Sequence, residues 1–219
     1  MDGNGRWAAA RGLPRTAGHR AGARSVRRVI EAASPLGIGT LTLYAFSADN
    51  WKRPPAEVNA LLGLLESYLT QETQKCVRHA VRLSFIGRRD RLPLPLCAAI
   101  EQAENTTSAA ARLHVRIAVD YSSRQAMLDA VRRLRSAPLV DRPAFERALA
   151  GTAPGAAEVD LLIRTGGEQR LSDFLLWECA YAEMYFTSVP WPDFERRHLE
   201  QALDAYRRRE RRFGALPAA

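Results

Sequence analysis

The chain has 219 residues, 47% of them apolar, and a net charge of +8. This composition suits a compact domain with a sizeable core and excludes disordered and collagen-like chains. The apolar runs are far shorter than the roughly 20 residues that a membrane-spanning helix needs. Met1 is followed by Asp2 and Gly3 rather than by an apolar signal segment, so we expect a cytoplasmic protein.

The positive charge indicates an anionic partner, and almost all of it comes from arginine, since Lys52 and Lys75 are the only lysines. Arginine binds phosphate through a planar fork of donors. Charge alone leaves nucleic acid, a diphosphate substrate and an anionic membrane face open. The three cysteines are far apart and lack the spacing of metal ligands, which is typical of small buried side chains in a reducing compartment.

Helical and strand patterns alternate along the chain. This alternation predicts an α/β fold in a single domain over 1–219, with a mainly parallel central sheet flanked by helices. In chain order, the predicted elements are a helix over 21–33, a strand over 40–46, a helix over 57–77, a strand over 81–86, a helix over 96–106, a strand over 113–119, a helix over 124–134, strands over 159–163 and 181–186, and a closing helix that ends near Gly214.

The first segment with chemical potential is MDGNGRW at the start of the chain. Gly3 and Gly5 flank Asn4, which allows backbone N–H groups to approach an anion closely. Asp2 could bind a divalent metal that the same anion touches. Pro14 suits the first turn of a helix, which would place Arg15 and His19 on one face, pointing back toward this loop.

The second segment is FSADNWKRP, which follows the strand predicted over 40–46. Ser47 and Asn50 are neutral hydrogen-bonding groups beside Trp51, and Arg53 follows. An aromatic face beside polar groups can line the reacting end of an apolar substrate and stabilise a developing cation.

The third segment is IRTGGEQRLSDF, at the end of the strand predicted over 159–163. Arg164, Arg170 and Ser172 surround a Gly-Gly turn and are suited to clamp a diphosphate. Glu168 could orient the two arginines. Because ligands of parallel sheets sit beyond the carboxyl ends of the strands, we expect this segment to lie near the second one.

Together these segments resemble the signature regions of the cis-prenyltransferases, the family of undecaprenyl diphosphate synthase. The later segments AYAEMYF, WPDF and RRRERRFG resemble the carboxyl end of that family. The resemblance runs in order from Met1 to Gly214 and so covers essentially the whole chain.

The resemblance implies a role for each matched residue. Asp2 and Asn50 would be catalytic, with Asn50 acting in proton transfer, and Asp2 and Glu183 would bind Mg²⁺. Substrate binding would fall to Gly3, Asn4, Gly5, Arg6, Trp7, Arg15, His19, Ser47, Ala48, Asp49, Trp51, Arg53, Arg164, Arg170, Leu171 and Ser172.

The resemblance also implies a six-stranded sheet, a homodimer and two substrates, isopentenyl diphosphate and an allylic prenyl diphosphate. Apolar positions from Leu61 to Leu69 would line a tunnel for the growing chain. The expected product is a Z-polyprenyl diphosphate that serves as the precursor of a lipid carrier and is made from farnesyl or geranyl diphosphate. Such a product favours peripheral contact with a membrane.

Two departures from the family pattern are visible. The family has an apolar strand ahead of the aspartate, whereas Asp2 is the second residue here, so we expect a strand upstream of this sequence. Residues 120–123 read DYSS, where bacterial enzymes more often have Asn-Tyr-Gly-Gly. Three alternatives remain: a short-chain synthase, a non-catalytic partner subunit, and a nucleic-acid-binding protein, which the clustering of basic residues at the motif loops disfavours.

Overall fold

The computed structural model describes residues 1–137, 139–150 and 158–209. Its larger sheet has three parallel strands, β1 (Thr40–Ser47), β2 (Val81–Ile86) and β3 (Leu113–Tyr121), in the order β1-β3-β2. The central strand β3 is buried along most of its length, because helices cover both faces of a parallel sheet.

A second, smaller sheet contains β4 (Leu161–Arg164) and β5 (Glu183–Phe186), which also pair in parallel. The expectation of six strands in one sheet is therefore wrong for the described residues, which form five strands in two sheets. β1 and β4 each pair on one edge only, and both line the same large cavity, so this cavity separates the two sheets.

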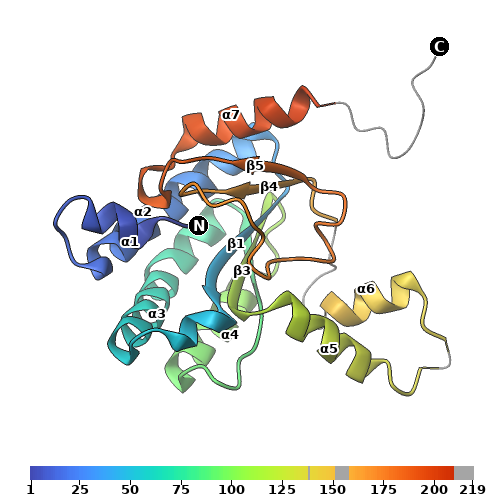
Figure 1. The fold of residues 1–219 in the computed structure, drawn as a ribbon. Coiled ribbons are helices and arrows are strands. Elements are labelled where there is room, and N and C mark those ends of the chain that lie inside the picture. Colours follow the sequence, from blue (N-terminus) through green and yellow to red (C-terminus); the bar gives the residue numbers. More distant parts are fainter. Residues whose placement is uncertain (138, 151–157, 210–219) are drawn as a thin grey trace, which may run out of the picture.

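Seven α-helices surround the sheets in the described part of the chain (Figure 1). They are α1 (Asn4–Ala9), α2 (Arg15–Ala33), α3 (Pro55–Arg78), α4 (Leu94–Thr107), α5 (Ser123–Arg133), α6 (Arg142–Ala150) and α7 (Arg196–Arg207), joined by three 3-10 turns, η1 (Ser34–Leu36), η2 (Ala48–Lys52) and η3 (Trp191–Asp193).

Every strand and helix predicted from the sequence is present, β2 matches in both bounds, and the largest difference at a helix start is at α2, which begins six residues before its predicted start. The closing helix α7 ends at Arg207, seven residues before the predicted end near Gly214, which itself lies outside the described residues. Two helices were not predicted, α1 and α6. α1 is only six residues long, and its N-cap Gly3 is in the left-handed conformation. Its sequence therefore resembles that of a loop, although it forms a short helix.

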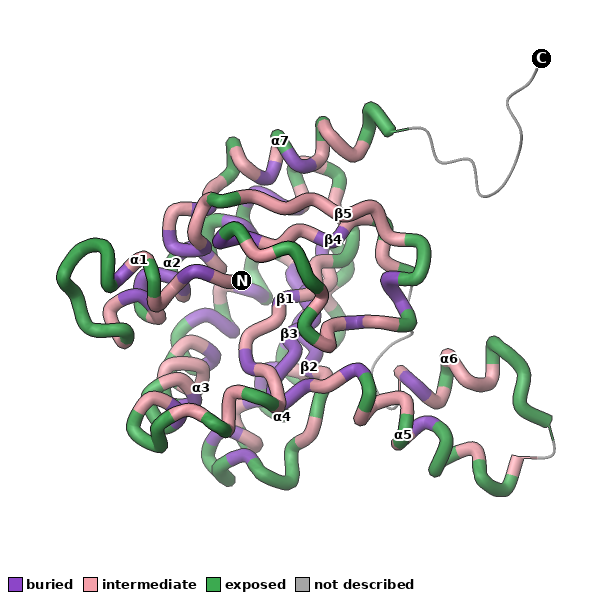
Figure 2. Tube along the Cα trace, viewed as in Figure 1, coloured by how far each residue is buried: buried purple, intermediate pink, exposed green. Residues whose placement is uncertain are grey.

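The main core lies between the three-stranded sheet and helices α2, α3 and α4, where Leu69, Leu96 and Val115 are almost completely buried (Figure 2). α5 and α6 pack on each other at one side of the molecule and expose more of their residues (Figures 1 and 2). None of the helices in the described ranges combines the length and apolar character required to cross a membrane.

Candidate active site

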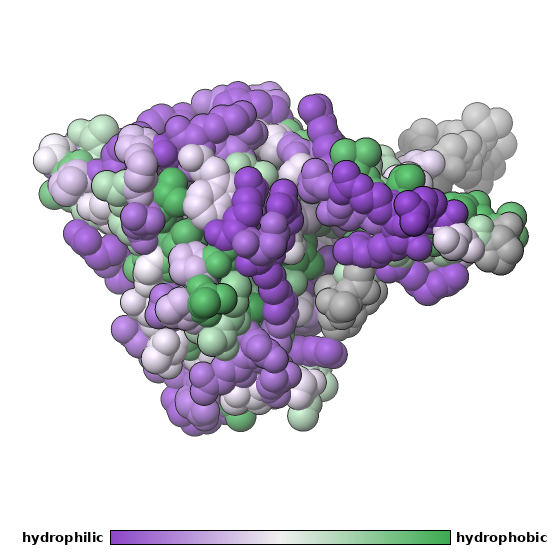
Figure 3. Space-filling model, turned by 90° about the horizontal axis from the view of Figure 1, so that it is seen from below, coloured by the Kyte–Doolittle hydropathy of each residue, from purple (hydrophilic) through white to green (hydrophobic). Residues whose placement is uncertain are grey.

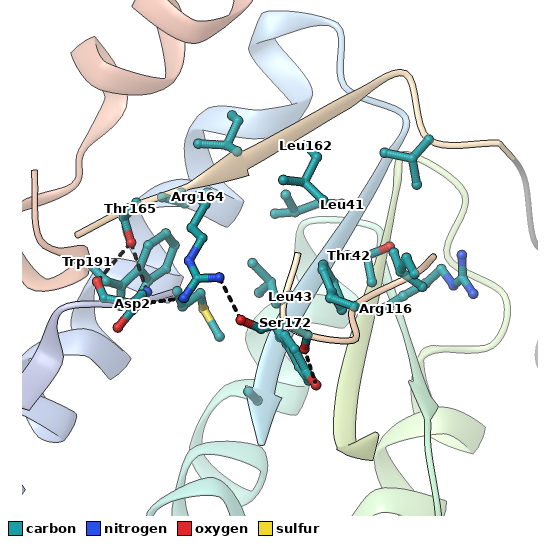
Figure 4. Close-up of a pocket in the computed structure, with 18 of the residues that line it drawn as sticks. Asp2, Leu41, Thr42, Leu43, Arg116, Leu162, Arg164, Thr165, Ser172 and Trp191 are labelled. Carbon is teal, nitrogen blue, oxygen red and sulfur yellow. Dashed lines mark hydrogen bonds and ion pairs between the residues drawn. The ribbon is translucent and has the colours of Figure 1, made fainter. Parts of the chain in front are cut away.

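A cavity of about 860 Å³ opens between the two sheets, and all three sequence motifs contribute to its wall. Figure 4 shows Asp2 from the first motif and Arg164 and Ser172 from the third. The polar part of the cavity gathers residues from the first turn of the chain, from the end of β1 and from the end of β4. The remainder is lined by apolar side chains that include Leu41, Leu43 and Leu162. The site therefore joins a charged end to an apolar wall.

Arg164 connects the third motif to the first. Its guanidinium donates from Nη1 to Ser172 Oγ at 2.8 Å and from Nη2 to Asp2 Oδ2 at 2.9 Å (Figure 4). The Arg164 side chain is only 14% exposed, which strengthens both charge-assisted bonds. Residues 162 positions apart in the sequence thus form one polar group.

Asp2 is held by its backbone as well as by Arg164. Its N–H donates to Thr165 Oγ1, whose hydroxyl donates in turn to the Asp2 carbonyl, both at 2.9 Å. Burial alone would raise the pKa of Asp2, but the hydrogen bonds from Arg164 and the Gly3 N–H, with the charge of Arg6, bring it below its usual value. The carboxylate is therefore ionised at neutral pH and remains 38% exposed.

Glu57, on the first turn of α3, holds the second group of basic side chains. It accepts hydrogen bonds from Arg15 Nε at 3.1 Å, His19 Nε2 at 3.3 Å and Arg53 Nη1 at 3.0 Å. Burial would raise the pKa of Glu57, but the bonds from Arg15 and His19 bring it below its usual value. Burial lowers the pKa of His19, so this imidazole is neutral at pH 7.

The turn η2 carries the second motif. Asn50 Oδ1 accepts a hydrogen bond from the Ser47 N–H at 3.1 Å, which fixes the amide at the start of the turn. Trp51 packs edge-on against Phe46, with ring centroids 5.3 Å apart, and its Nε1 donates to Asp120 Oδ1 at 2.9 Å. The indole therefore anchors the turn to the sheet.

The structure brings most of the predicted residues to one cavity. The cavity is lined by Asp2, Asn4, Gly5, Arg15, His19, Ser47, Asp49, Asn50, Arg53, Arg164, Arg170, Leu171 and Ser172.

Five predicted substrate-binding residues, Gly3, Arg6, Trp7, Ala48 and Trp51, lie beside the cavity rather than in its described lining. Trp7 donates from Nε1 to Asp193 Oδ1 at 2.7 Å, and Arg6 lies 3.6 Å from Asp2 and 3.7 Å from Glu168.

Glu183 does not join Asp2 in one metal site within this chain. It is the first residue of β5 and pairs with Leu161, whereas Asp2 contacts Arg164 and Thr165 at the other end of β4. The Glu183 carboxylate accepts a hydrogen bond from Arg209 at 2.6 Å. Among the described residues, no group of three His, Cys, Asp or Glu side chains is arranged to hold a metal. Asp2 and Glu183 lie toward opposite ends of β4.

Glu57 and Thr165 are polar contributors that were not predicted as site residues but bond directly to predicted ones, and the cavity wall also includes the unpredicted polar residues Thr42, Tyr44, His114 and Arg116. Glu57 lies four positions after Arg53, which is the spacing of a helical ion pair and could have suggested it. Thr165 carried no such signal, because its partner Asp2 is distant in the sequence.

The chain matches the sequence model of the family described as "Putative undecaprenyl diphosphate synthase" over residues 1–214. It is 56% identical to isoprenyl transferase 1 of Bradyrhizobium diazoefficiens, over 100% of this chain and 88% of the relative. It is 45% identical to the isoprenyl transferase of Aquifex aeolicus, over 99% of this chain and 94% of the relative.

Solved structures agree with these sequence relationships. Lavandulyl diphosphate synthase from Lavandula x intermedia, in complex with dimethylallyl diphosphate, superposes with a TM-score of 0.93 at 36% identity, over 98% of this chain and 95% of the other. A probable undecaprenyl diphosphate synthase from Campylobacter jejuni gives a TM-score of 0.81 at 33% identity, over 89% and 92%. Sequence, fold and the convergence of the three motifs thus agree, and the chain belongs to the undecaprenyl diphosphate synthase family of isoprenyl transferases.

Proposed function

We propose that this protein is a Mg²⁺-dependent cis-prenyltransferase that condenses isopentenyl diphosphate with an allylic diphosphate to give a Z-polyprenyl diphosphate. The observation that carries this proposal is the presence of two separate basic groups on the wall of one cavity that also has a large apolar surface. Two diphosphates and a hydrocarbon chain need such a site.

The group around Arg164 would bind isopentenyl diphosphate. Arg164, Arg170 and Ser172 all line the cavity, and the Arg164 guanidinium is already oriented by Asp2 and Ser172. A guanidinium held in this way loses little freedom when it binds a phosphate, which favours affinity.

The group around Glu57 would bind the allylic diphosphate. Arg15, His19 and Arg53 surround a single carboxylate, so the group keeps positive charge after Glu57 is neutralised. Holding both diphosphates in one cavity would supply much of the acceleration by bringing the reacting carbons together.

Asp2 fits a metal site of the kind in which one carboxylate and the substrate phosphates bind Mg²⁺. Its carboxylate is ionised, partly exposed and on the cavity wall beside Arg164. Magnesium, when bound, would stabilise the negative charge of the departing diphosphate. Arg164 would hold the Asp2 carboxylate in place for this role.

Asn50 would orient a substrate group rather than act as a base. An amide has no useful basicity near neutral pH, and its oxygen already accepts the Ser47 N–H. The NH₂ group of the same amide is the donor that remains to face the cavity.

The cavities are consistent with two product lengths, a long polyprenyl chain and a short one. The 860 Å³ cavity favours a polyprenyl product. A second, mostly apolar cavity of about 120 Å³ lies between α2, α3 and β1 and is lined by Val26, Leu61, Leu65 and Tyr68. A dry cavity of roughly 150 Å³ holds one benzene-sized molecule, so this smaller space favours a short-chain synthase, in line with the likeness to lavandulyl diphosphate synthase.

We also propose a homodimer and peripheral contact with membranes. α5 exposes Leu128 at 55% and Val131 at 59%, and Figure 3 shows hydrophobic residues among hydrophilic ones on the arm formed by α5 and α6. Exposed apolar residues on one helix support association between copies. Light scattering on the purified protein tests the homodimer, and co-sedimentation with lipid vesicles tests the membrane contact.

The reaction is tested by incubating the protein with radiolabelled isopentenyl diphosphate, farnesyl diphosphate and Mg²⁺ and resolving the products by chain length. Long products support the polyprenyl synthase, and products that stop after one or two additions support the short-chain synthase. Absence of incorporation with several allylic primers would contradict both and leave the partner subunit as the explanation.

A further inference from the structure

We infer that Asp120 is a positioning residue: it fixes the Trp51 indole and, through it, the turn η2 that presents Asn50 to the cavity. The contact itself stands on the geometry alone. Its consequence for catalysis rests on the function proposed above.

Asp120 occupies an irregular position at the carboxyl end of β3. The pairing of β1 with β3 joins Phe46 to Val119 and Ser47 to Tyr121, so Asp120 is passed over. Its φ is 48°, in the left-handed region that residues other than glycine adopt rarely, with Asp and Asn among the more frequent. Such a bulge redirects a side chain, and here it turns the carboxylate toward η2.

The carboxylate of Asp120 is completely buried, yet both of its oxygens are bonded. Oδ1 accepts the Trp51 Nε1–H at 2.9 Å, and Oδ2 accepts Arg91 Nε at 2.9 Å. Arg91 also donates from Nη2 to Oδ1 and places its guanidinium 5.4 Å from the centre of the Trp51 ring. Arg91 therefore neutralises the buried charge and closes a triangle of three side chains.

The loop that carries Arg91 is attached to the same bulge. The Arg88 N–H donates to the Asp120 carbonyl at 3.2 Å. Gly87, with φ 116°, lies so close that a Cβ there would come within 1.9 Å of the Val119 carbonyl oxygen. Three segments thus meet at Asp120: the end of β3, the loop after β2 and the turn η2.

Trp51 transmits this attachment to the site. It directly follows Asn50 within η2, and its ring packs on Phe46, at the end of β1. Asn50 and Ser47 line the cavity, whereas Trp51 is outside its described lining. Loss of the Asp120 contact should therefore displace Asn50 without removing any group that lines the cavity.

The contact is tested by ¹⁹F NMR on the full chain labelled with 5-fluorotryptophan, which gives signals from four tryptophans. Trp51→Phe identifies the Trp51 signal. Asp120→Ala should shift and broaden that signal, while Asp120→Asn, which keeps an acceptor oxygen, should leave it near the wild-type position. The matched control is Arg89→Ala, which breaks a nearby surface ion pair with Glu104.

The kinetic test measures kcat and the KM of each substrate in the same variants. We expect Asp120→Ala to lower kcat by about 10- to 100-fold, since small misplacements cost this much, with both KM values within about twofold of wild type. Asp120→Asn should recover most of the loss, and adding Trp51→Phe to Asp120→Ala should cost little more.

A Trp51 signal that does not move in Asp120→Ala would overturn the inference. So would equal kinetics in Asp120→Ala and Arg89→Ala when the two variants lose a similar amount of thermal stability. If the wild-type protein incorporates no isopentenyl diphosphate, the proposed function fails, and the NMR signal still decides whether Asp120 holds Trp51.

Discussion

The carboxylate of Asp2 and the guanidinium of Arg164 lie 2.9 Å apart, and the same guanidinium donates to Ser172. This contact links the first turn of the chain to the end of β4 and orients both groups toward one cavity. It explains how a site of dispersed motifs can be preorganised before any substrate binds, and it leads to the first of five predictions.

Arg164→Ala should reduce kcat/KM for isopentenyl diphosphate by about a hundredfold or more. Hydrogen bonds to charged groups contribute roughly 1.5–3 kcal/mol each, and about 1.4 kcal/mol corresponds to a factor of ten. Arg164→Lys keeps the charge but not the fork and should lose less. Arg142→Ala, which removes exposed ion pairs of α6, is the control and should leave kcat/KM nearly unchanged. Equal kinetics for both alanine variants would contradict the assigned role.

Removal of Mg²⁺ with a chelator should abolish incorporation, and readdition should restore it. Asp2→Asn should lose about a thousandfold in kcat even at high Mg²⁺, because the amide cannot supply the charge that the metal needs. Titration of the rate against Mg²⁺ concentration measures both effects. An Asp2→Asn enzyme with wild-type Mg²⁺ dependence would show that Asp2 is not the metal ligand.

Glu57→Gln should raise the KM of the allylic diphosphate about tenfold and change the KM of isopentenyl diphosphate much less. The amide cannot hold Arg15, His19 and Arg53 as the carboxylate does, so these donors lose their common orientation. Steady-state kinetics with each substrate varied in turn measures the difference. Glu101→Gln, on the exposed face of α4, is the control.

Stability should fall in two stages as the pH is lowered. The pKa values of His19 and His114 are lowered by burial, so below about pH 6.5 the unfolded chain binds more protons than the folded one and folding weakens. Asp2 and Glu57 also have lowered pKa values, so their contribution persists above about pH 4.5 and is lost only below it. Thermal unfolding from pH 8 to 3 measures both stages.

His19→Gln should remove the part of the first stability loss that comes from protonation of His19 and leave the second loss unchanged. Glu57→Gln should reduce the second stage. A first stage that is unchanged in a His19→Gln, His114→Gln double variant would contradict this assignment.

Leu65→Trp should shorten the products. Leu65 lines the smaller apolar cavity between α2 and α3, and a bulkier ring would fill space that the hydrocarbon chain needs. Product chain length on reversed-phase separation is the measurement. Leu94→Trp, at the exposed start of α4, tests for a non-specific effect of added bulk.

Local patterns were enough to predict much of this fold. β2 matches its predicted bounds, and α3 extends its predicted helix by two residues at the start and one at the end, because apolar periodicity and flanking turn residues are properties of neighbouring positions. The five strands predicted from local patterns are all present, but the single six-stranded sheet implied by the family resemblance was wrong for the described residues, since pairing depends on which edges meet in space. β4 and β5 form their own sheet, separated from β1 by the cavity.

The sequence by itself determined the family and the types of residue in the site, because the motifs require particular side chains at particular spacings. Only the tertiary structure decided which of them meet. It joined Asp2 to Arg164, placed Glu57 among three donors and separated Glu183 from Asp2. Where the partners lie on different elements, they are 38 to 162 positions apart in the sequence. Whether such residues meet depends on how helices and sheets pack and not on local sequence.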